Sequence, residues 1–263
     1  MDAINESAVL TIGGKTYPYE EVINYEAVKH GFLNSNDGVA ISFWIISISM
    51  IAATVFFLME SFSVSVKWKT SMNVGALVTL VAAVHYLYMR EFWVLIHGSP
   101  ILYRYIDWTI TVPLQMIEFN LILKAVKPDI SAGMFWRLLV GTVVMLLCGY
   151  CGESHIIDPT IGFIFGLSGW GFILNEIFNG EAGQVNASGG SVNKHVQASF
   201  GTMRCIVTIG WSIYPLGYFF GYLLGGVAPS ALNLLYNLAD FVNKIAFCLA
   251  IWSCGKASTL ENA

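Results

Sequence analysis

Charged side chains are scarce in this sequence of 263 residues. Asp, Glu, Lys and Arg together make up 11% of it, whereas hydrophobic residues make up 56%, and the mean hydropathy is +0.65. A soluble domain carries about 25% charged residues, so this chain lacks the polar surface that a protein of its size presents to water. The formal net charge is −4 and no cluster of Lys and Arg is present. We therefore expect no nucleic-acid partner.

Cysteine is also rare, with five residues in or beside apolar segments. Cys148 and Cys151 form a C-x-x-C motif, a spacing found in redox and metal sites. No second pair accompanies it, and it lies in an apolar segment, so we interpret both as packing residues and predict no metal site. A cleavable signal is not expected either, because residues 1–37 lack a basic flank followed by an apolar core.

Long apolar runs are abundant instead. Seven of them cover residues 38–60, 71–92, 100–123, 132–151, 158–178, 197–224 and 230–253. Since a membrane-spanning helix needs about 20 apolar residues, the pattern predicts an all-α membrane protein, a bundle of seven transmembrane helices. We divide the chain into a polar N-terminal segment (1–37), a helical domain (38–254) and a tail (255–263), without a second domain.

The distribution of basic residues predicts the orientation in the membrane. The connections after the first, third and fifth segments, together with the tail, hold Lys67, Lys69, Lys124, Lys127, Lys194 and Lys256. The opposite side holds only Lys15, Lys29 and Arg90. By the positive-inside rule the N-terminus is outside and the C-terminus cytoplasmic. We expect a multi-pass protein of the plasma membrane or of a eukaryotic internal membrane.

The third segment carries charge at membrane depth. Arg104, Asp107 and Glu118 lie in it, together with Thr111, and each charge there costs about 2.5–3.5 kcal/mol on insertion scales. At about 100° per residue these four side chains share one helical face. Asp107 and Glu118 are separated by roughly 16 Å along the axis, at about 1.5 Å per residue. Two titratable groups at different depths of one helix indicate a proton path.

The seventh segment supplies a partner. Asp240 and Lys244 lie one turn apart, and Lys244 is too deep to reach either membrane surface. One interpretation is a structural ion pair that holds helices together. The other is a reactive amine that forms a Schiff base with an aldehyde. Together with Arg104 and Asp107 these residues can form a cluster without net charge. Glu118 has no cation within reach and is expected to be protonated at rest.

Aromatic residues offer a binding pocket. They are Trp108, Trp170, Trp211 and Tyr214, and the last is followed by Pro215, which is expected to kink its helix. Aromatic residues in membrane spans commonly serve packing or anchor the chain at the interface. Their position near a buried lysine equally fits a slot for a flat conjugated ligand.

Three motifs resemble the microbial rhodopsins, and within them the proteorhodopsins. They are Arg104-Tyr-Ile-Asp107-Trp108 with Thr111-Val-Pro and Glu118, Trp211-Ser-Ile-Tyr214-Pro215, and Leu238-Ala-Asp240-Phe-Val-Asn-Lys244. The likeness runs from about Gly38 to Trp252 and covers all seven segments. It implies a seven-helix bundle enclosing all-trans retinal, which is bound covalently to Lys244 as a protonated Schiff base.

The resemblance also implies roles for individual residues. Asp107 corresponds to the primary counterion and proton acceptor, Asp240 to the second counterion, and Glu118 to the proton donor. Arg104 corresponds to a gate beside the counterions. The aromatic residues above and Pro215 correspond to the retinal pocket. The set Asp107, Thr111 and Glu118 matches the signature of proton pumps in this family.

Three further residues acquire a meaning from the resemblance. His85 is either an ordinary hydrogen-bonded histidine of the core or the histidine that proteorhodopsins hold beside the acceptor; in the second case it bonds to Asp107 and modulates it. Trp44 matches a residue that meets this histidine across a protomer boundary, which implies a homo-oligomer of five or six subunits in membrane lipid. Gln115 occupies the position that sets the colour, and an amide there resembles the blue-absorbing type.

The sequence thus predicts a retinal-binding, light-driven outward proton pump, an ion transporter and not an enzyme. A photosensory rhodopsin that signals to a partner is the first alternative, although Glu118 speaks against it. A transporter without retinal, in which Asp240 and Lys244 form a plain ion pair, is the second.

Overall fold

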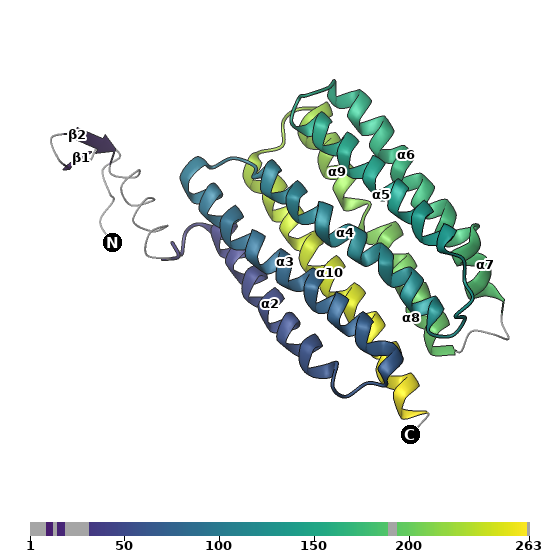
Figure 1. The fold of residues 1–263 in the computed structure, drawn as a ribbon. Coiled ribbons are helices and arrows are strands. Elements are labelled where there is room, and N and C mark those ends of the chain that lie inside the picture. The colour runs from purple at the N-terminus through teal and green to yellow at the C-terminus, as the bar shows by residue number, and fades with distance from the viewer. Residues whose placement is uncertain (1–8, 13–14, 19–31, 189–193, 262–263) are drawn as a thin grey trace.

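The computed structural model describes residues 9–12, 15–18, 32–188 and 194–261. Near the N-terminus, β1 (Val9–Ile12) and β2 (Lys15–Pro18) form a short antiparallel hairpin that pairs Val9 with Pro18 and Ile12 with Lys15. These two strands were not expected from the sequence, in which residues 1–37 form a polar segment. The remainder of the described chain is a bundle of long helices that lie side by side (Figure 1).

All seven predicted segments are helical. The first five are α2 (Gly38–Glu60), α3 (Val66–Ile96), α4 (Ile101–Lys124), α5 (Ala132–Glu153) and α6 (Pro159–Phe178), after which comes the short α7 (Glu181–Ala187). The sixth consists of α8 (Lys194–Cys205), η1 (Ile206–Gly210), α9 (Ile213–Tyr218) and η2 (Phe219–Leu223). The seventh, α10 (Pro229–Leu260), includes residues 255–260, which we had assigned to the tail.

The helices alternate in direction, which gives the bundle two ends. We call the end where α2 begins the N-terminal end; it also contains the α3–α4, α5–α6 and η2–α10 connections. The opposite, C-terminal end contains the α2–α3 and α4–α5 connections and the end of α10 (Figure 1). Short polar side chains begin several helices: Asp37 accepts a hydrogen bond from the Ala40 amide, and Asp158 accepts from Thr160 and Ile161. Such caps satisfy backbone amides that a helix leaves free.

Six helical segments of the described chain are long and apolar enough to cross a membrane. They are residues 38–60, 66–96, 132–153, 159–187, 194–223 and 229–260. The helix outside this set is α4, in which Arg104, Asp107 and Glu118 are all buried. Large apolar side chains such as Ile45, Leu147 and Leu238 point out of the bundle. The molecule is therefore apolar outside and polar in the interior around α4, as a membrane protein requires.

The sixth segment is interrupted near the predicted proline. Pro215 has no amide hydrogen, so the Trp211 carbonyl accepts instead from the Tyr214 amide in a tighter turn. Just before it, η1 is a π-helical turn whose Gly210 carbonyl accepts a hydrogen bond of 2.9 Å from Asn243 Nδ2 of α10. Single π-helical turns occur frequently at functional sites. Here the turn joins the sixth segment to α10 one residue before Lys244.

Glycine allows α5 and α6 to approach closely. A Cβ atom added to Gly162 would lie 2.7 Å from the Gly152 Cα, and one added to Gly169 would lie 2.6 Å from the Met145 amide nitrogen. Both neighbours are backbone atoms and cannot move aside as a side chain does. The two helices can therefore pack in this way only because these positions lack a side chain.

Candidate functional site

Lys244 forms two short ion pairs in the interior of the bundle. Its Nζ lies 2.6 Å from Asp107 Oδ2 of α4 and 2.7 Å from Asp240 Oδ2, one turn earlier on α10. The side chain of Lys244 is 3% exposed, and both carboxylates are completely buried. Water screens such pairs very little, so the amine and the carboxylates depend on one another for charge compensation.

The two carboxylates differ in their other partners. Asp240 accepts hydrogen bonds from the Tyr214 hydroxyl at 2.6 Å and the Tyr86 hydroxyl at 2.9 Å, and Trp108 Nε1 donates to both of its oxygens. Asp107 Oδ1 is buried, and no described residue donates a hydrogen bond to it. Because donated hydrogen bonds stabilise a carboxylate charge, the charge of Asp240 is the better compensated of the two.

Arg104 is buried beside this cluster but is not ion-paired within it. Its Nη2 donates to Asn233 Oδ1 at 2.9 Å and to Asn237 Oδ1 at 3.4 Å, and the guanidinium lies 5.0 Å from the centre of the Tyr236 ring. The closed four-charge cluster expected from the sequence is therefore wrong in this detail. Arg104 donates to the side-chain amide oxygens of Asn233 and Asn237 instead of to a carboxylate. Its positive charge interacts with Asp240 without a direct hydrogen bond.

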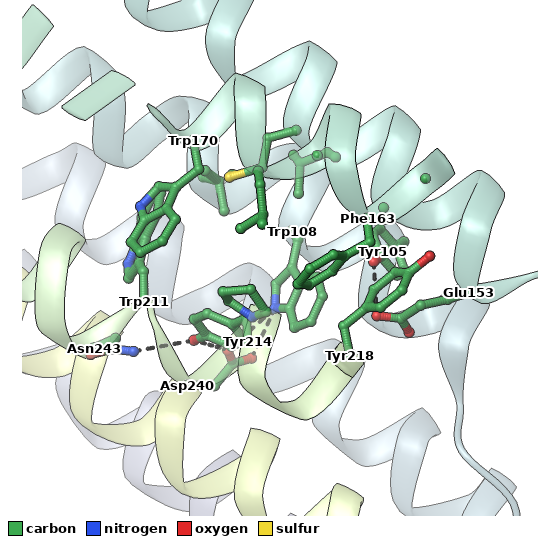
Figure 2. Close-up of a pocket in the computed structure, with 18 of the residues that line it drawn as sticks. Tyr105, Trp108, Glu153, Phe163, Trp170, Trp211, Tyr214, Tyr218, Asp240 and Asn243 are labelled. Atoms are coloured by element: carbon green, nitrogen blue, oxygen red, sulfur yellow. Dashed lines mark hydrogen bonds between the residues drawn. The ribbon is translucent and has the colours of Figure 1, made fainter. Parts of the chain in front are cut away.

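A cavity lies beside Lys244 and is lined by all six residues predicted for the pocket. The space between its walls amounts to about 790 Å³, including the part open toward the outside. The predicted lining residues found there are Trp108, Gln115, Trp170, Trp211, Tyr214 and Pro215, and Asp240, Asn243 and Lys244 complete this wall. Figure 2 shows Trp170 and Trp211 together at one end and Trp108 and Tyr214 further along.

The other predicted residues of α4 occupy three different environments. Thr111 is completely buried and donates to the Asp107 backbone carbonyl, 2.9 Å away. Gln115 is 2% exposed, borders the cavity, and no described residue accepts from its amide nitrogen. Glu118 is 1% exposed, and neither of its carboxyl oxygens accepts a hydrogen bond from a described residue. The Ser71 side chain is a polar neighbour of this carboxyl group. No described cation pairs with Glu118.

His85 and Trp44 lie on α3 and α2, and both are half-buried. The predicted hydrogen bond from His85 to Asp107 is not formed: His85 Nδ1 is 2.8 Å from the Val81 carbonyl oxygen. His85 remains close enough to Asp107 for an electrostatic interaction. Trp44 lies under the Arg90 guanidinium, 5.7 Å from the ring centre. Neither arrangement tests the predicted protomer boundary.

Several polar residues of the site were missed in the sequence. Asn233 and Asn237 belong to the same helical face as Asp240 and Lys244, a spacing of three or four residues that was readable in an apolar helix. Tyr86 could not be found in this way, because its contact with Asp240 joins residues 154 positions apart. Glu153 falls just outside the predicted apolar run 132–151, but it is the last residue of α5, is 3% exposed, and borders the cavity.

Comparison with known proteins agrees with this architecture. Residues 37–257 match the family described as bacteriorhodopsin-like protein, and the chain belongs to that family. It is 46% identical to the blue-light absorbing proteorhodopsin of Gamma-proteobacterium Hot 75m4, over 86% of this chain and 90% of the relative. The green-light absorbing proteorhodopsin of Gamma-proteobacterium EBAC31A08 is also 46% identical, over 85% and 88%.

Solved structures lead to the same family. The crystal structure of a blue light-absorbing proteorhodopsin from Med12 superposes with a TM-score of 0.73 at 46% identity, covering 84% of this chain and all of that one. Exiguobacterium sibiricum rhodopsin gives a TM-score of 0.74 at 29% identity, over 85% of this chain and 98% of that one. The predicted seven-helix fold and the resemblance to proteorhodopsins are therefore confirmed, and the protein is a membrane-embedded helical protein of this family.

Proposed function

We propose that the chain binds retinal covalently through Lys244 Nζ and is a light-driven outward proton pump. The observation that supports this most strongly is the buried amine between Asp107 and Asp240, 2.6 and 2.7 Å from their oxygens, at the wall of an aromatic cavity. The proteorhodopsin relatives support the same assignment.

The residues present fit retinal. A conjugated aldehyde needs a primary amine, flat apolar walls and compensation for a positive nitrogen, and the cavity offers Lys244, the rings of Trp108, Trp170 and Trp211, and two carboxylates. Trp170 is fixed by a hydrogen bond of 3.0 Å from its Nε1 to the Val207 carbonyl oxygen, which holds one wall in place. When bound, all-trans retinal supplies light absorption and a change of shape at the Lys244 nitrogen.

Asp107 is the proposed proton acceptor. Its Oδ2 is 2.6 Å from Lys244 Nζ, within proton-transfer distance, and its other oxygen receives no hydrogen bond from a described residue. Asp240 is equally close but accepts from Tyr214, Tyr86 and Trp108, which favours keeping its charge. Light therefore moves a proton from the Lys244 nitrogen to Asp107, while Asp240 stays negative.

Glu118 is the proposed donor that replaces this proton. It is nearer the C-terminal end of α4 than Asp107, by roughly 16 Å along the helix axis. Its buried carboxyl group has no cationic partner among the described residues, so the neutral, protonated form is the stable one in the dark. With the C-terminal end cytoplasmic, as the positive-inside rule predicts, protons leave on the N-terminal side. Arg104, Thr111 and His85 modulate the acceptor.

We also propose that copies of the chain assemble as a ring of five or six, with Trp44 and His85 at the protomer boundary. Both side chains are half-buried in the single chain, so each retains surface for a neighbour. Cross-linking in native membranes would count the subunits, and a Trp44→Ala variant is expected to shift the assembly to smaller species.

The test of the pump is illumination of cells or oriented vesicles that contain pigmented protein, with the external pH recorded with and without a protonophore. We expect outside acidification that the protonophore abolishes. Pigmented protein that produces no acidification would instead support a photosensor. Lys244→Ala is expected to abolish the visible band. Lys256→Ala is the matched control, because Lys256 lies on the same helix but near its C-terminal end, where it pairs with Glu60; this variant should keep the band. A Lys244→Ala protein that keeps its colour would refute the assignment of the retinal linkage.

A further inference from the structure

Cys248 of α10 is a buried thiol at a depth between the proposed proton donor and the Lys244 nitrogen. It lies one turn after Lys244, so its Cα is about 6 Å nearer the C-terminal end of the bundle, at about 1.5 Å per residue. On α4, which runs in the same direction, Glu118 is displaced toward that end by roughly 16 Å from Asp107. Since Asp107 contacts Lys244 Nζ, the thiol occupies the interval that the proton has to cross.

The thiol donates a weak hydrogen bond at rest. Its Sγ lies 3.9 Å from the Gly75 carbonyl oxygen of α3, and Cys248 is 2% exposed. The absence of a side chain at Gly75 makes room for it, because a Cβ there would lie 3.4 Å from Cys248 Cβ and 3.5 Å from Sγ. The Thr79 hydroxyl is 3.1 Å from the same carbonyl oxygen, which therefore keeps a partner when the thiol turns away. The other neighbours of the thiol are apolar and include Phe57, Ala76 and Val78.

Glu118 lacks the hydrogen bonds that a buried carboxylate requires. Both of its oxygens are buried, and no described residue donates to them. This suits the neutral form at rest, but loss of the proton leaves a buried negative charge without a cation. Ser71 is one polar neighbour, and it lies one turn before Gly75 on α3. Glu118 and Lys244 are the charged groups that interact electrostatically with Cys248. The thiol is therefore within range of the charge that forms on Glu118.

We propose that Cys248 is a positioning residue for reprotonation, an inference that rests on the proposed function. At rest its S–H group donates to the Gly75 carbonyl. The O–H bond of Glu118 then breaks, and its proton forms an N–H bond at the Lys244 nitrogen. The thiol rotates about its Cα–Cβ bond and donates to the new carboxylate, because a hydrogen bond to a charged acceptor is the stronger one. The S–H bond stays intact throughout, and the thiol returns to Gly75 when Glu118 regains a proton.

The test is time-resolved infrared difference spectroscopy of the retinal-bound protein, following the S–H stretch and the carboxyl C=O band that Glu118→Gln removes. In the unmodified protein we expect the S–H band to move to lower frequency while the C=O band is lost, and both to recover together. Cys248→Ala should slow reprotonation of the Lys244 nitrogen, measured by flash spectroscopy, about 10-fold, the low end of the effect of a hydrogen bond to a charged group. Cys248→Ser retains a donor of similar size and should restore the rate.

Cys254→Ala is the matched control. Cys254 is also a buried thiol of α10, 3% exposed, but it lies further toward the C-terminal end, so its removal should change neither the rate nor the shifting S–H band. An S–H band that stays in place while the Glu118 band is lost would overturn the inference alone. So would an unchanged rate in Cys248→Ala, or a Cys248→Ser protein as slow as Cys248→Ala. Pigment in which Glu118 keeps its proton throughout the cycle would overturn the proposed donor as well.

Discussion

The close contact between α5 and α6 leads to a sharp prediction for Gly169→Ala. The new Cβ would lie 2.6 Å from the Met145 nitrogen, 2.8 Å from the Gly141 oxygen and 3.0 Å from the Met145 Cα. All three are backbone atoms, so a change of rotamer cannot relieve the overlap. Carbon atoms in good contact are about 3.5–4.0 Å apart, and the helices must therefore separate by roughly 1 Å.

The expected cost follows from overpacking of a tight core, about 1–3 kcal/mol. For a chain of this size each kcal/mol lowers Tm by about 2–4 °C, so Gly169→Ala should lower Tm by roughly 2–12 °C. The measurement is the helical circular dichroism signal during heating in one detergent. Because α5 and α6 both line the cavity, we also expect retinal to bind more slowly or less tightly.

Gly171→Ala separates this effect from that of adding a methyl group to α6. Gly171 is exposed on the same helix, and a Cβ there would meet no atom within 4 Å. Alanine favours a helix over glycine, so the control should be as stable as the unmodified protein or slightly more so. Equal Tm values for Gly169→Ala and Gly171→Ala would show that the α5–α6 contact is not as close as described.

Three predictions concern the pigment. Asp107→Asn removes one of the two anions at Lys244 Nζ, so the visible band should move to the red and transport should stop; an unchanged band in an absorption spectrum would contradict this. Glu118→Gln should slow recovery of the dark state, followed by flash spectroscopy, roughly 100-fold while leaving the colour nearly intact; unaltered decay would assign the donor role to another group. Gln115→Leu replaces a buried amide of the cavity by an apolar side chain, so a blue-absorbing parent should shift to the red, and an identical spectrum would refute a colour-setting role.

The buried polar face of α4 was readable because polar residues are conspicuous in an apolar segment. Arg104, Asp107, Thr111 and Glu118 repeat at helical spacing, and all four are buried as that spacing predicts. The buried polar residues of α10 repeat at the same helical spacing. Asp240 and Lys244 were predicted because they are charged, whereas the uncharged Asn233 and Asn237 were not. Helical periodicity thus assigns side chains to a face of one helix.

Contacts between side chains of different helices were harder to predict from the sequence. The sequence predicted that Arg104 would pair with carboxylates, whereas it binds Asn233 and Asn237, and that His85 would bond to Asp107, whereas it faces the Val81 carbonyl. Glu153 lies beyond the predicted apolar run 132–151, yet the end of α5 keeps it inside the bundle. Such outcomes depend on the rotation and tilt of neighbouring helices, which no single segment specifies.

The sequence by itself determined the seven apolar helices, the face of α4 that carries charge and the presence of a lysine at depth, because hydropathy and helical period are properties of one segment at a time. Only the tertiary structure decided which carboxylate is surrounded by donors, that Glu153 borders the same cavity as Lys244, and that Gly169 has no space for a methyl group. These features arise where separate helices meet at van der Waals distance, so they depend on packing that the order of residues along one helix does not encode.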